Sequence, residues 1–157
     1  MNAVQDELLK EFRGYAKTAG SVTALMEHMA MHLHEKMTRY NWTGFYLVDA
    51  ADENFLVVGP YSGSFTPNAR ISLEKGLCGA AAKTGQVVIV QDVTKDPRYL
   101  AGETTLVKSE IVVPIFANKK LAAELDIESY FAETFTKPEQ EFVEACAAVV
   151  ANFLATH

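Results

Sequence analysis

The order of hydrophobic patterns along the chain constrains its fold more than any other feature. Residues 1–40 and 136–157 carry apolar residues at helical spacing, and Thr136 and Glu139 have the spacing of a capping box at the start of the last helix. Between them, short aromatic and β-branched runs separated by turn residues predict strands: "WTGFYLVD", "FLVVGPY", "ARISL", "QVVIVQDV", "SEIVVPIF" and "KLAAELDIES". This order predicts an α+β fold in which an antiparallel sheet of about six strands has the N- and C-terminal helices on one face.

The other face of the sheet needs a cover, because its side chains would otherwise form an open apolar surface. Only two segments remain to supply it, a short helix predicted at 77–84 and the polar, irregular segment 94–108. A sheet face covered by a short helix and loops encloses a pocket. We therefore expect a ligand pocket on the face opposite the terminal helices.

Length and charge narrow the class of protein. The 157 residues suit one domain with one core. A net charge of −6 argues against nucleic acid or an anionic membrane as a partner, because both favour a basic surface. No apolar run approaches the ~20 residues that span a bilayer, and the charged N-terminus has no signal-peptide core. A cytoplasmic location is expected.

The chain contains two cysteines, Cys78 and Cys146, and they form no CxxC or Cys/His metal spacing. Cys78 begins the short helix in "GLCGAAAKTG", and a helix N-terminus can lower a thiol pKa. Cys146 lies among alanines and valines of the last helix and is expected to be buried there. Cys78 is therefore the better candidate for a nucleophile.

Carboxylates and aromatic residues are the candidate ligand contacts. Asp126 and Glu128 are two residues apart in a predicted strand, so both project from one face. They either face solvent or face inward, where they must be paired or bind something. Trp42 and Tyr46 begin the first strand and can supply aromatic walls. Such a pocket suits an amine-bearing ligand.

Several motifs together resemble one known family. "NWTGFYLVD", "VVGPYSG", "KGLCGAAAKTGQ", "SEIVVPI" and "LDIES" occur in the order found in GAF domains, and specifically resemble free methionine-(R)-sulfoxide reductases. The resemblance implies a single GAF domain over residues 1–157, with an enclosed pocket for a small zwitterion. It assigns ligand contacts to Trp42, Tyr46, Glu110, Asp126 and Glu128, the last being aspartate in the family pattern.

The cysteines depart from that pattern. The resemblance implies a nucleophilic cysteine and a second cysteine that resolves the sulfenic acid as a disulfide, which thioredoxin reduces. The matching segments here, "DPRYLAGETTLVK" and "SFTPNARI", contain no cysteine, and the nucleophile falls near Ala101, Gly102 and Glu103. Cys78 matches the remaining family cysteine. Loss of the nucleophile removes chemistry that needs a covalent intermediate.

The leading hypothesis is therefore a sensor or regulatory module that binds a small amine-bearing metabolite, of the methionine-sulfoxide type, and is catalytically degenerate. The alternative is a free methionine-(R)-sulfoxide reductase acting through Cys78 with an external thiol, and thioredoxin is a partner only in that case. A third reading is a protein-interaction domain with an empty pocket. The terminal helices favour a homodimer.

No cofactor or metal is expected. His28 and His32 are four residues apart on a predicted helix, a spacing that can hold zinc. Because the sequence places no acid at a suitable third position, the pair is interpreted as ordinary helix residues. Arg98 in "DPRY" is either a ligand contact or part of a loop turn.

Overall fold

The fold is described by a computed structural model for residues 1–100 and 104–157. One six-stranded sheet has the order β3-β2-β1-β6-β5-β4, and every neighbouring pair is antiparallel. The predicted α+β class and strand number are confirmed. The elements are α1 (Ala3–Ala16), α2 (Val22–Lys36), β1 (Trp42–Val48), β2 (Phe55–Gly63), β3 (Arg70–Ser72), α3 (Gly76–Thr84), β4 (Val88–Val90), η1 (Val93–Lys95), β5 (Ser109–Ala117), β6 (Lys120–Ser129) and α4 (Lys137–Thr156).

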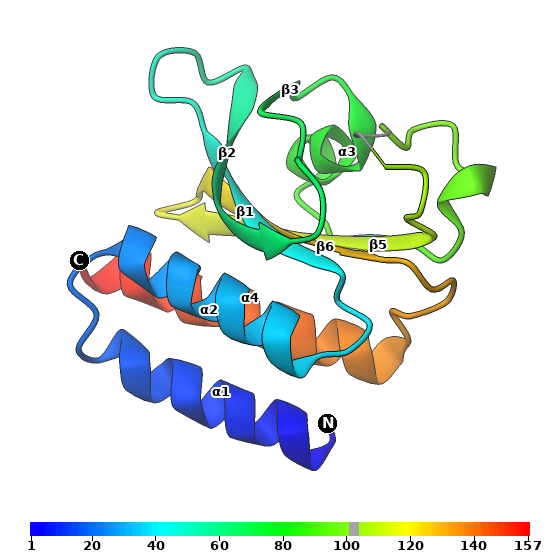
Figure 1. The fold of residues 1–157 in the computed structure, drawn as a ribbon. Coiled ribbons are helices and arrows are strands. Elements are labelled where there is room, and N and C mark those ends of the chain that lie inside the picture. Colours follow the sequence, from blue (N-terminus) through cyan, green and yellow to red (C-terminus); the bar gives the residue numbers. More distant parts are fainter. Residues whose placement is uncertain (101–103) are drawn as a thin grey trace.

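The helices form two layers on one side of the sheet (Figure 1). Helices α2 and α4 cover the sheet, while α1 packs against α2 and α4 on their outer side. The expected placement of the terminal helices on one face is confirmed; α1 lies in an outer layer there, with its stripe of Leu8, Leu9 and Phe12 buried against the other helices. Helix α3 lies on the opposite side of the sheet.

Strand alternation divides the core into two clusters. Phe45, Ile111 and Leu125 point toward α2 and α4 and belong to the larger cluster. Tyr46 and Val112, immediate neighbours of Phe45 and Ile111 in the strands, point to the other face and pack with Leu77 and Cys78 of α3. The sheet therefore separates a helical core from a smaller core that contains Cys78.

Helix α4 has the predicted N-cap residue, Thr136, but not the predicted capping box. Thr136 is its N-cap without a capping side-chain hydrogen bond, and Glu139 instead accepts a hydrogen bond from the Tyr40 hydroxyl. The Tyr40 ring is buried, so its hydroxyl needs a partner. Within the described residues, neither this helix nor any other has the length and apolarity to cross a membrane.

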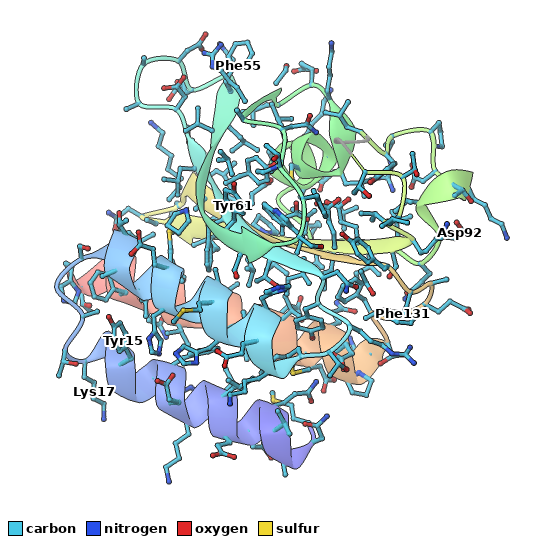
Figure 2. All side chains as sticks on the ribbon, in the orientation of Figure 1. Tyr15, Lys17, Phe55, Tyr61, Asp92 and Phe131 are labelled. Carbon is cyan, nitrogen blue, oxygen red and sulfur yellow. The ribbon has the colours of Figure 1, made fainter. Side chains whose placement is uncertain are left out.

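Glycine at 63 makes room for the Trp42 ring, which is fully buried and stacks on Tyr61, labelled in Figure 2. Gly63 pairs with Trp42 across β1 and β2, and a Cβ at 63 would lie 2.5 Å from Trp42 Cδ1 and 2.9 Å from its Cα. We predict that Gly63→Ala lowers the free energy of unfolding in urea by about 1–3 kcal/mol, because the overlap forces backbone to move.

Gly14→Ala is the matched control. Gly14 lies in α1, and a Cβ added there would meet no neighbouring side chain or backbone atom within 4 Å outside its own helix turn. The same substitution should there raise the free energy of unfolding by about 0.5–1 kcal/mol, through helix propensity alone. Equal effects at the two positions would contradict the role given to Gly63.

Candidate functional site

A cavity lies between the sheet and α3, on the face opposite α2 and α4. The sheet supplies one carboxylate from β5, two from β6 and the ring of Tyr46. The space open to the centre of a water molecule is only about 30 Å³, so a larger ligand enters only if lining side chains move. The remaining walls are Gly76, Leu77 and Cys78 of α3, Ile71 of β3 and the loop residues Phe65, Pro67, Asn68 and Leu100.

Strand register brings the carboxylates together. Glu110 of β5 lies opposite Glu128 of β6, and Asp126 is two residues before Glu128 on the same face. On the other side of β6, Gly44 lies opposite Asp126. Because glycine has no side chain, the Trp42 ring occupies the space over Gly44, where a Cβ would lie 2.5 Å from Trp42 Cη2.

A fourth carboxyl, Glu124, extends the row and was missed by the sequence analysis. It lies opposite Tyr46 and is fully buried. The signal was present in "AELDIES", where Glu124, Asp126 and Glu128 alternate with apolar residues. Neither Glu124 oxygen has a hydrogen-bond partner among the described residues. The two alternatives left open by the sequence are thereby separated, because Asp126 and Glu128 face inward and not solvent.

None of the four carboxyls forms an ion pair with a described basic residue. Burial therefore raises all four pKa values, with the charge of Asp126 adding to the effect on the other three. The pKa of Asp126 rises to about 6, held down by hydrogen bonding to Glu110, and that of Glu124 rises to about 9. The pKa values of Glu110 and Glu128 lie well above the usual range. Asp126, whose charge raises the other three pKa values, is the carboxyl of the row that ionises most readily.

Cys78 lines the same cavity. Its Sγ, a carboxyl oxygen of Glu110 and one of Asp126 all lie within 4.8 Å of one another. Burial, and then the charge of Asp126, raise the thiol pKa. The expectation that the helix start lowers this pKa is wrong, because desolvation and the neighbouring acids outweigh the helix. The thiol is protonated at neutral pH.

The aromatic side of the site differs from expectation. Tyr46 lines the cavity, and its hydroxyl donates a 3.0 Å hydrogen bond to the Asn68 carbonyl. Trp42 is not among the described lining residues; its ring lies behind, 5.9 Å from the ring of Phe65, which forms the wall. Trp42 lies opposite Glu128, which lines the cavity, but its ring lies over Gly44 and stacks on Phe65 of the β2–β3 loop, so that it is fully buried.

Other expected positions lie away from the cavity. Arg98 pairs with Asp96 of its own loop at 2.7 Å, as in the loop-turn interpretation. Cys146 is fully buried in the helical core, as expected. The positions expected for the family nucleophile, Ala101, Gly102 and Glu103, lie outside the described residues.

The buried row of acids predicts a particular pH dependence of stability. Glu124 has a pKa of about 9 in the folded protein, against an ordinary value of 4.5. Its contribution to the free energy of unfolding is therefore fully present below about pH 4.5 and is lost as pH rises through 9. We predict that the free energy of unfolding of the wild type falls between pH 5 and 9. In Glu124→Gln the fall should be shallower by up to about 1.4 kcal/mol per pH unit.

Glu141→Gln, at an exposed glutamate of α4, is the control and should follow the wild-type curve. Denaturant unfolding at several pH values measures all three proteins. Parallel curves for wild type and Glu124→Gln would show that Glu124 titrates alike in the folded and unfolded chains.

Comparison with known proteins agrees with this geometry. The GAF domain profile matches residues 23–154. The free methionine-R-sulfoxide reductase of Saccharomyces cerevisiae is 42% identical over 113 residues, which cover 70% of this chain but only 61% of the yeast protein. The Escherichia coli protein of the same name is 29% identical over 150 residues, covering 96% of this chain and 88% of that protein.

A solved structure extends the similarity to three dimensions. The free methionine-R-sulfoxide reductase from Neisseria meningitidis, determined in complex with its substrate, superposes with a TM-score of 0.89 at 28% identity. The superposition covers 98% of this chain and 91% of that one. This chain belongs to the GAF domain family and is homologous to free methionine-R-sulfoxide reductases.

Proposed function

We propose that the cavity binds free methionine-(R)-sulfoxide and that Cys78 reduces it with an external thiol as the reductant. One observation carries the proposal: a thiol, an ionised carboxylate and a protonated carboxyl share one cavity, with Cys78, Asp126 and Glu110 in mutual reach. Relatives named for this reaction support it better than they support the regulatory-module hypothesis.

The row of acids suits the ammonium group of an amino acid. Asp126 supplies one negative charge in a buried setting, where an ion pair is strong, and neutral Glu110 and Glu128 add hydrogen-bond acceptors. Phe65 and Leu100 are the apolar walls available to the methyl end of the ligand. Because the cavity is narrow, these two side chains must move on binding.

The reaction balances with two thiols per sulfoxide. Cys78 Sγ attacks the sulfoxide sulfur and its proton passes to a neighbouring carboxylate, while neutral Glu110 can protonate the sulfoxide oxygen. After a second protonation by that carboxylic acid, the S–O bond breaks and the oxygen leaves as water, so that Sγ is bonded to the methionine sulfur. Water then attacks Sγ and returns its proton to a carboxylate; the Sγ–S bond breaks with its electron pair on the methionine sulfur, which releases methionine and leaves Cys78 as a sulfenic acid. A first thiol forms a mixed disulfide with loss of water, and a second regenerates Cys78 and leaves as a disulfide.

A second candidate is binding without turnover, the regulatory module of the sequence analysis. The buried, protonated state of Cys78 favours it, because the thiolate is the nucleophile. The absence of cysteine from residues 64–71 and 96–108 favours it too, since no second cysteine can resolve a sulfenic acid there.

One experiment separates the two candidates. The purified chain is incubated with free methionine-(R)-sulfoxide and dithiothreitol, methionine is measured by chromatography, and the (S)-epimer serves as the control. We expect methionine from the (R)-epimer alone, together with a ligand-dependent rise in melting temperature. A rise without methionine supports the second candidate and overturns reduction. No rise and no methionine overturns both, and leaves the interaction-domain reading.

A further inference from the structure

A second cluster of ligand-type side chains lies between α1 and α2, on the far side of α2 from the sheet. It consists of Glu11 from α1 and of His28 and His32 from α2, and we call it the α1–α2 histidine site. One ligand atom from each residue lies within 4.8 Å of the others. The histidines were expected to be ordinary helix residues for want of a third ligand, and the helix packing brings Glu11 to them.

Packing fixes the orientation of the first histidine. The His28 ring stacks on Tyr15, labelled in Figure 2, with centroids 3.9 Å apart, and meets Phe12 edge-on. Its Nε2 lies 2.6 Å from Glu11 Oε1. His28 is thus held by three residues of α1, with Nε2 directed at the carboxylate.

The contact between Glu11 and His28 accounts for the positions of these two side chains, but it does not account for the proximity of His32. The His32 ring lies one helical turn further on, with its centroid 4.2 Å from that of His28 and tilted by 47°. Two imidazoles this close on one helix face, with a carboxylate between the helices, form the donor set that a transition metal takes. Calcium and magnesium are disfavoured because they require oxygen ligands.

We propose that the α1–α2 histidine site binds one Zn²⁺ ion through Glu11, His28 and His32 and thereby links α1 to α2. Zinc accepts imidazole nitrogen and carboxylate oxygen at about 2.0–2.2 Å, and three protein ligands leave its fourth position to water. The side chain of Glu11 is 46% exposed, so it is free to make the small shift that opens its contact with His28 for the ion. The site is independent of the cavity and of the function proposed for it.

The test is a titration of the chelator-treated full chain with Zn²⁺ by isothermal calorimetry, with melting temperature as the second readout. We expect one ion per chain and a melting temperature that rises with zinc. His32→Ala is the decisive variant, because it removes a ligand and leaves the Glu11–His28 pair and hence the zinc-free fold. Its affinity should fall by more than the about 10–100-fold that loss of an outer partner costs.

Two controls locate the ion. His157→Ala removes a histidine at the C-terminus and should bind zinc as the wild type does. Cys78→Ser should also bind normally, which separates this site from the Cys78, Glu110 and Asp126 cluster in the cavity. Wild-type affinity in His32→Ala, loss of binding in Cys78→Ser, or no binding by the wild type would each overturn the proposal.

Discussion

Asp126→Asn should abolish the rise in melting temperature that free methionine-(R)-sulfoxide causes, while the protein stays folded. Asp126 is 3% exposed and is the carboxyl of the row that is mainly ionised near pH 7, with a pKa of about 6. Asparagine has the same shape without the charge, so a bound ammonium loses its counterion. Removing one partner of a buried pair costs about 3–5 kcal/mol, which lowers affinity at least about a hundredfold.

Glu128→Gln is the matched control within the same cavity. Glu128 is protonated near neutrality because its pKa is raised well above the usual range, so the substitution exchanges one neutral group for another. It should reduce the thermal shift far less than Asp126→Asn does. In the wild type the shift should also shrink below pH 6, as Asp126 takes up a proton. Equal losses in the two variants would mean that shape and not charge holds the ligand.

Much of this site follows from strand periodicity. Alternation in "AELDIES" is by itself enough to place Glu124, Asp126 and Glu128 on one face of a strand. The resemblance adds Glu110, and the register of β5 with β6 brings it beside Glu128. Residues on neighbouring strands of one hairpin are local in sequence, and such contacts are the ones a pattern predicts well.

Contacts between distant segments could not be predicted in this way. The depth of Trp42 depends on the β2–β3 loop folding over it, and the meeting of Glu11 with His28 depends on how α1 crosses α2. The pKa of the Cys78 thiol could not be predicted from the local sequence either. The helix start around Cys78 favours a low thiol pKa, but the acids that raise it come from β5 and β6. A local rule failed there because the opposing groups are brought in by the tertiary fold.

Cys78→Ser should reduce methionine formation from free methionine-(R)-sulfoxide to the rate measured without protein. A serine hydroxyl cannot carry the oxygen as a sulfenic acid, so no covalent route remains. The substitution keeps the size and hydrogen-bonding capacity of the side chain, and the ligand-dependent rise in melting temperature should persist. Loss of activity with binding retained is a result that a merely structural role for Cys78 does not produce.

Cys146→Ser is the control, because Cys146 is fully buried on α4 across the sheet from the cavity. It should lower stability, since a hydroxyl replaces a thiol in an apolar core, and yet retain turnover per folded molecule. A sulfenic-acid reagent such as dimedone should label wild-type Cys78 only after sulfoxide is added, because the thiol itself does not react with it. If Cys78→Ser still forms methionine at the wild-type rate, the oxygen is taken up elsewhere. Since Cys146 is then the remaining thiol, the double variant decides whether the chain is a reductase at all.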